Sequence, residues 1–192
     1  MGKGRLEAFS DGVIAILITI MVLELRPPVG VELSALLPLI PIFLSYVLSF
    51  VFLGIYWNNH HHLFQAVQRV NGRVLWANLH LLFWLSMVPF VTAWMGENNF
   101  AAWPVALYGV VLFLAGGAYY VLVRALLPLH TPESALAVAV SNNLKEKLSL
   151  VFYAMAIPLA FIIPLLSCAL YVLVAVIWFI PDQRIERVMG GD

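Results

Sequence analysis

Three consecutive histidines, His60-His61-His62, and an aspartate in an apolar run, Asp11, are the residues whose types suggest chemistry. Imidazole and carboxylate groups bind metal ions and transfer protons. Adjacent residues on a helix point about 100° apart, so three histidines in a row do not converge on one ion. The His-x-x-x-His spacing of metal-binding helices is missing from the apolar segments. We therefore expect no metal site and interpret the histidines as a hydrogen-bond network at a helix end, together with Asn58 or Asn59.

A catalytic interpretation makes Asp11, His80 and the three histidines the acid–base groups of an intramembrane enzyme, which requires these side chains to converge. His80 lies in an apolar run, where histidine more often forms hydrogen bonds between packed helices than a proton relay. Cys168 is the single cysteine, so it forms no disulfide within the chain, and we interpret it as a small buried side chain. We expect no catalytic residues.

The composition sets the environment in which these residues work. The chain has 192 residues, of which 63% are hydrophobic and 10% charged, whereas soluble domains are about 45–50% apolar. A chain this short cannot bury so many apolar side chains in a water-soluble core. Ten basic residues balance ten acidic ones, so no net positive field collects nucleic acid. We predict an integral membrane protein and exclude a soluble enzyme and a nucleic-acid-binding domain.

The apolar segments predict an all-α protein. A membrane-spanning helix needs about 20 mostly apolar residues, and we expect six spans in a single domain that covers residues 1–192. The charge-free window from Leu148 to Pro181 is too long for one span, and Pro164 and Ser167 provide a break near its middle. The expected spans are residues 9–25, 36–57, 74–95, 103–124, 146–163 and 165–180.

The basic residues predict the orientation. With six spans and both termini in the cytoplasm, every basic residue except Arg26 lies on the cytoplasmic side. Five spans would move Arg184 and Arg187 outside, which fits the positive-inside rule less well. The remaining cytoplasmic residues are Lys3, Arg5, Arg69, Arg73, Arg124, Lys145 and Lys147.

The first span has one face made of small or apolar residues and a single hydroxyl. At 100° per residue this face is about 100° wide, and Asp11 lies roughly 100–140° from its middle. Periodicity alone leaves two interpretations open, an ordinary lipid-facing or packing surface and a functional face. The residues that share the face are Gly12, Ile16, Thr19, Ile20 and Leu23.

The start of this span resembles a known signature. Arg5-x-x-x-Phe9-Ser10-Asp11, followed by Gly-Val-x-Ala-Ile, is similar to the first-helix motif of prokaryotic relatives of transmembrane protein 175, a family of potassium-permeable channels. The run from Tyr56 to His62, which contains Trp57, resembles the end of that family's second helix. The resemblance implies the single-repeat form, a homotetramer in which four first helices line one central pore.

The resemblance also assigns roles. It implies that Ile16 forms the narrowest ring of the pore, that Thr19 adds a polar layer, and that Ile20 and Leu23 continue the lining. It implies no cofactor beyond permeant potassium ions, and no partners beyond further copies of the chain and membrane lipid. The residues expected in a structural network away from the ion are Arg5, Phe9, Ser10, Asp11, Trp57, Asn58, and His60 or His61.

The expected function is that of a passive potassium-permeable channel in a bacterial plasma membrane. No Thr-Val-Gly-Tyr-Gly filter is present. The ring of isoleucines that the resemblance implies can instead close by dewetting. The alternatives are a proton channel or a weakly selective cation leak of the same architecture, a non-conducting membrane scaffold, and the intramembrane enzyme.

Overall fold

The structure, a computed structural model, describes residues 2–134, 136–137, 140 and 144–179. Every regular element in this part of the chain is helical, which confirms the predicted all-α class. The α-helices are α1 (Lys3–Ile20), α2 (Ile40–Ala66), α3 (Gly72–Ser86), α4 (Val88–Glu97), α5 (Ala102–Leu126), α7 (Leu144–Leu159) and α8 (Pro164–Phe179), and the short 3-10 helices are η1 (Met21–Glu24), η2 (Leu33–Leu39) and η3 (Leu127–Leu129).

Four helical segments are long and apolar enough to cross a membrane, namely Lys3–Glu24, Leu33–Ala66, Gly72–Glu97 and Ala102–Leu129. The third is interrupted at Met87, between α3 and α4. Pro89 has no backbone N–H and is placed in the first turn of α4, where a helix tolerates proline. The expected third span is therefore two helices in line.

Helices α7 and α8 are shorter than the other segments. Each has 16 residues, which corresponds to about 24 Å against a hydrocarbon core of about 30 Å. Helix α8 begins at Pro164, the position where the sequence predicts a break. The two helices form a hairpin that packs on α5, and α8 also contacts α2.

Helix α2 extends further than expected, from Ile40 to Ala66. The three histidines lie in the last two turns of α2, and the helix continues beyond them through Leu63 and Phe64. Both side chains are buried in the core, and their packing keeps the last turns helical.

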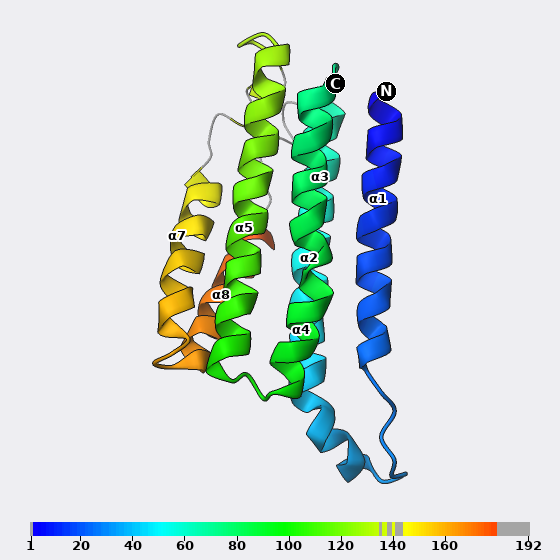
Figure 1. The fold of residues 1–192 in the computed structure, drawn as a ribbon, viewed down its shortest axis with the longest axis vertical. Coiled ribbons are helices and arrows are strands. Elements are labelled where there is room, and N and C mark those ends of the chain that lie inside the picture. The colour runs from blue at the N-terminus through cyan, green and yellow to red at the C-terminus, as the bar shows by residue number, and fades with distance from the viewer. Residues whose placement is uncertain (1, 135, 138–139, 141–143, 180–192) are drawn as a thin grey trace.

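The helices run up and down along one direction (Figure 1). The beginning of α1, the end of α2, the beginning of α3 and the end of α5 meet at one end of the bundle. These helix ends carry Lys3, Arg5, Arg73 and Arg124, while Arg26 follows η1 at the opposite end. Arg184 and Arg187 lie outside the described residues.

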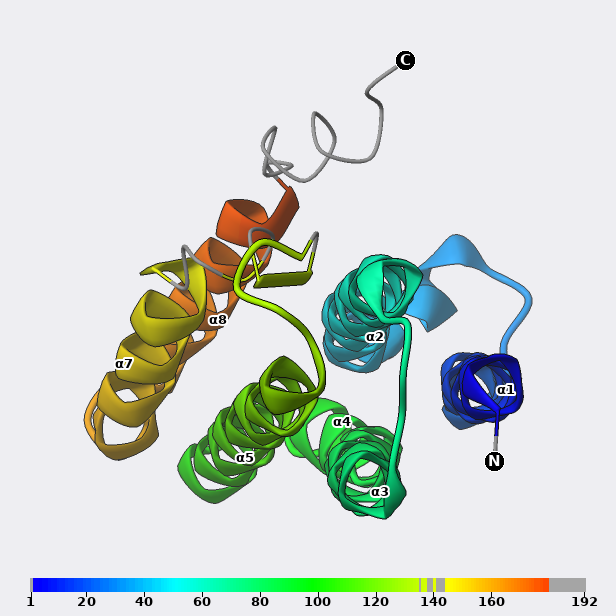
Figure 2. The same ribbon diagram turned by 90° about the horizontal axis from the view of Figure 1, so that it is seen from above.

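Helix α1 occupies an edge of the bundle (Figure 2). Its main neighbours are α2 and α3, while α5 lies among α3, α4, α7 and α8. Among the described residues, one side of α1 is therefore left without a partner.

Candidate functional site

The two sides of α1 differ sharply in burial. The buried side consists of Leu6, Ser10, Ile14 and Leu17, which recur every three or four residues and face α2 and α3. The uncovered side contains the stripe predicted from helical angles. On it, Ile16 is 59% exposed, Ile20 40% and Leu23 74%, and Gly12 and Thr19 are exposed as well. The candidate pore residues therefore share one accessible face of α1, and Ile14 lies on the opposite side.

The Thr19 hydroxyl donates a hydrogen bond to the carbonyl oxygen of Ile16, with an O···O distance of 2.9 Å. Because the hydroxyl hydrogen is directed at the helix backbone, the lone pairs of Thr19 Oγ1 remain available as acceptors. Thr19 thus presents oxygen one turn away from the exposed Ile16 side chain. This arrangement suits a cation or a water molecule better than an anion.

A buried hydrogen-bond chain joins the other side of α1 to α3 and α2. The Asn78 amide Nδ2 donates to Ser10 Oγ at 2.9 Å, and Asn78 Oδ1 lies 2.8 Å from His60 Nε2. Ser10 in turn donates to the Leu6 carbonyl at 2.9 Å. All three linked side chains are at most 1% exposed. Since a carbonyl oxygen only accepts, His60 Nε2 carries the hydrogen, and its buried Nδ1 has no partner among the described residues.

A second contact fixes α1 to α2 at the next residue. The indole Nε1 of Trp57 donates to Asp11 Oδ1 at 3.1 Å. The Trp57 ring stacks on His61, with centroids 5.9 Å apart and an interplanar angle of 17°. The Gln65 amide completes the series, with its Nε2 atom 2.8 Å from His61 Nε2. Asp11 therefore faces α2 and does not point along the uncovered face of α1.

A family model described as "Endosomal/lysosomal potassium channel TMEM175" matches residues 5–89. A relative named a potassium channel, from Chryseobacterium sp. (strain P1-3), is 52% identical over 187 residues and covers 97% of both chains.

The chain belongs to the TMEM175 family.

Two further comparisons agree with this assignment. The crystal structure of a lysosomal potassium-selective channel TMEM175 homolog from Chamaesiphon minutus superimposes with a TM-score of 0.78 at 30% identity, covering 92% of this chain and 96% of that one. A human relative named "Endosomal/lysosomal proton channel TMEM175" is 29% identical over 209 residues, and the match covers 85% of this chain and 41% of the human protein. The chain is thus a membrane protein of an ion-channel family, and the intramembrane-enzyme alternative is excluded.

Three side chains expected in the network of a TMEM175 protein lie outside it within one chain. Arg5, Phe9 and Asn58 are exposed, and their side chains form no hydrogen bond with the part of the chain that the structure describes. Asn59, the next residue, instead donates from Nδ2 to the Ile55 carbonyl at 2.8 Å. The expected place of Arg5 in the network is therefore not formed with the described residues of one subunit.

Asn78 is the site residue that the sequence analysis missed. An amide within an apolar span is a signal of hydrogen bonding between helices, whereas the sequence prediction gave that role to His80, two residues further along. His80 is exposed and accepts a hydrogen bond from Trp84 Nε1 at 3.0 Å within α3. Within the described residues, no three His, Cys, Asp or Glu side chains are grouped to hold a metal ion.

Proposed function

We propose that this TMEM175 protein is a potassium-permeable channel that conducts passively through a pore lined by α1. Four chains assemble around the pore, and the uncovered faces of the four α1 helices form its wall. The observation that carries the proposal is the division of α1 into two faces. One is anchored by the buried hydrogen bond of Ser10 and the more exposed one of Asp11, and the other is left open by the described part of the chain. The bacterial relative and the solved homolog, both named as potassium channels, support it.

The anchoring determines which residues reach the pore. Ser10 and Asp11 hold α1 to α3 and α2, so the helix cannot rotate without breaking a buried polar contact. The exposed Ile16 side chain then points away from the subunit at a fixed angle. We assign Ile16 to the narrowest ring, and Ile20 and Leu23 to the wall beyond it.

A ring of four isoleucines would control conduction through the presence or absence of water in the narrow neck that it forms. A narrow apolar neck does not hold a continuous water column, so it closes the pore to ions without a moving gate residue. A slightly wider neck admits an ion only after the ion loses part of its hydration. Potassium holds water less tightly than sodium does, so this step favours potassium modestly.

Thr19 would lower the energetic penalty of that dehydration. Its hydroxyl hydrogen is bonded to the Ile16 carbonyl, so four Thr19 oxygens next to the neck offer lone pairs to a partly dehydrated cation. The stripe carries no charged side chain, so selectivity rests on dehydration and on these oxygens.

The charge distribution supports one orientation in a bacterial plasma membrane. The end of the bundle where α1 begins and α5 ends carries Lys3, Arg5, Arg73 and Arg124. Cytoplasmic ends of membrane proteins are enriched in lysine and arginine. We assign this end, and both chain termini, to the cytoplasm.

A proton channel of the same architecture is the second candidate, and the name of the human relative favours it. Flux assays on liposomes that contain the purified protein separate the two. The proposal predicts potassium influx that exceeds sodium influx, with proton flux measured in a parallel arm. Proton flux without potassium flux would support the second candidate, and no flux of any ion would support a scaffold. A native mass different from four chains would contradict the tetramer.

A further inference from the structure

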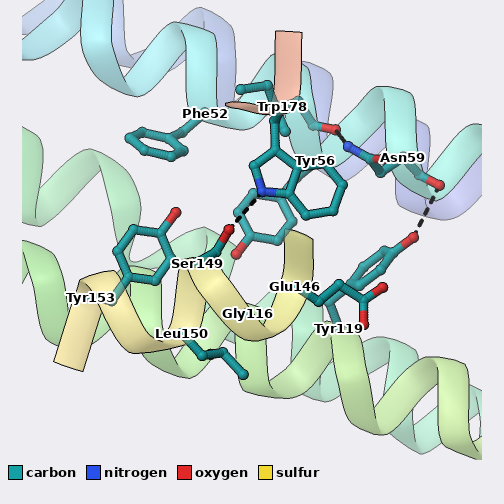
Figure 3. Close-up of a pocket in the computed structure, with 11 residues that line it drawn as sticks. Phe52, Tyr56, Asn59, Gly116, Tyr119, Glu146, Ser149, Leu150, Tyr153 and Trp178 are labelled. Atoms are coloured by element: carbon teal, nitrogen blue, oxygen red, sulfur yellow. Dashed lines mark hydrogen bonds between the residues drawn. The ribbon is translucent and has the colours of Figure 1, made fainter. Parts of the chain in front are cut away.

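A cavity lies on the side of the subunit away from α1, between α2, α5, α7 and α8 (Figure 3). It encloses about 40 Å³, and none of the residues assigned to the pore lines it. Aromatic rings dominate its wall, contributed by Phe52, Tyr56, Tyr119, Tyr153 and Trp178. The cavity is separate from the proposed conduction path, so what occupies it is an independent question.

One carboxylate faces this aromatic wall. Glu146 lies in the first turn of α7, and its side chain extends beside the Tyr119 ring (Figure 3). No hydrogen bond or ion pair joins Glu146 to another residue of the described chain. Neither lysine nor arginine is among the lining residues, and the adjacent Lys147 is exposed. A partly buried carboxylate of this kind is stabilised by a positive charge placed next to it.

Two hydroxyls of the wall are also without partners. Tyr56 and Tyr153 form no hydrogen bond with any described residue, although Tyr153 is only 3% exposed. By contrast, Tyr119 donates to the Asn59 carbonyl at 3.3 Å, and Trp178 Nε1 donates to Ser149 Oγ at 2.9 Å. Neither hydroxyl oxygen is among the fully buried unpaired atoms of the described residues, so both remain accessible and can donate to or accept from polar atoms of an occupant.

We propose that the cavity binds a small alkylammonium ion, that is, a protonated amine. The Glu146 carboxylate supplies the counter-charge, and the faces of Tyr56, Tyr119 and Trp178 attract the cation through their π electrons. Lys147, the next residue, supplies positive charge from outside the cavity, whereas an ammonium ion inside the cavity would place a positive charge directly beside the carboxylate. The cavity is small, about 40 Å³, so we expect methylammonium to fit and tetrabutylammonium to be too large.

Saturation-transfer NMR on the purified full-length protein, with methylammonium chloride as the probe, tests this proposal. We expect a saturable methyl signal for the wild type and at least a fivefold loss of that signal for Glu146→Gln. Glu97→Gln makes the same change on an exposed carboxylate at the end of α4, and it should leave the signal unchanged. Tetrabutylammonium should give no saturable signal.

A second pair of variants tests the proposal if Glu146→Gln is misfolded, that is, if its size-exclusion elution differs from that of the wild type. Tyr119→Phe retains the ring and should retain binding, whereas Tyr119→Leu removes the π face and should weaken binding severalfold. Ile16→Asn, which alters the proposed pore, should bind methylammonium as the wild type does. The proposal is overturned if the methylammonium signal of the wild type does not saturate, or if Glu146→Gln gives the same signal as the wild type. It is also overturned if Ile16→Asn loses the signal while Glu146→Gln retains it. None of these outcomes depends on whether the protein conducts potassium.

Discussion

The hydrogen-bond chain Ser10–Asn78–His60 makes a quantitative prediction about how firmly α1 is held. Ser10→Ala removes the acceptor of the Asn78 amide, a group that is fully buried. Hydrogen bonds between helices in membrane proteins contribute about 0.6 kcal/mol on average and up to about 1.7 kcal/mol. The complete burial of this pair places it in the upper half of that range, so we expect Ser10→Ala to lower the free energy of unfolding by about 1 kcal/mol.

Asn78→Ala should have the larger effect. It removes both hydrogen bonds of the amide and leaves the His60 Nε2–H buried without an acceptor. An unpaired buried donor costs about 1–3 kcal/mol, and the two lost bonds overlap with that penalty. We expect a decrease in the free energy of unfolding of about 2 kcal/mol. Because the two residues contact each other, the double variant should show a coupling energy of about 1 kcal/mol.

Equilibrium unfolding in mixed detergent micelles with increasing dodecyl sulfate, at one fixed protein concentration, measures these differences. Ser86→Ala is the matched control, because Ser86 donates to the Phe83 carbonyl of its own helix and is exposed. Its effect should stay below about 0.5 kcal/mol. If Ser10→Ala and Ser86→Ala destabilise equally, or if Ser10→Ala and Asn78→Ala are strictly additive, the network does not anchor α1.

Three further predictions concern Asp11, Thr19 and Gly109. Asp11→Ala leaves the Trp57 indole without its acceptor and should reduce the tetramer fraction in size-exclusion chromatography, whereas Asp11→Asn should be milder; an unchanged tetramer with unchanged thermal stability would count against the role of Asp11. Thr19→Val keeps the width of the side chain and removes the hydroxyl, so the potassium preference over sodium should fall without a leak; an unaltered flux ratio would exclude Thr19 from the selectivity step. Gly109→Ala adds a Cβ that would overlap the Tyr171 hydroxyl, so it should lower the free energy of unfolding by about 1–3 kcal/mol. Gly117→Ala, where a Cβ meets nothing within 4 Å, should have no such effect, and equal losses would refute the packing argument.

Much of the fold follows from apolar periodicity and proline, but helix lengths do not. The break at Pro164 could be predicted because proline favours the first turn of a helix. The extension of α2 to Ala66 could not be predicted, because hydropathy indicates which segments lie in lipid. It does not indicate that Leu63 and Phe64 pack against the core of the subunit. Tertiary contacts of this kind decide where a helix ends.

The same limit applies to the site. The angular argument for α1 correctly placed Ile16 and Leu23 together on an accessible face, because a regular helix fixes relative side-chain directions. The partners across helices were harder to predict, since they depend on which residues of α2 and α3 lie at the level of Ser10. Asn78 of α3 lies beside Ser10 and forms a hydrogen bond with it, whereas His80 bonds within its own helix. Arg5 has no hydrogen-bond partner among the described residues of its own chain.

The relative potassium and sodium fluxes of Ile16→Asn test the central claim most directly. If four Ile16 side chains form the neck, an amide at this position holds water there, so sodium flux should rise relative to potassium flux while the tetramer persists. Ile163→Asn is the control, since Ile163 is 50% exposed compared with 59% for Ile16 and follows α7, far along the chain from α1. Its flux ratio should equal that of the wild type. Indistinguishable ratios for Ile16→Asn and Ile163→Asn, at equal tetramer density in the liposomes, would contradict a pore lined by this face of α1.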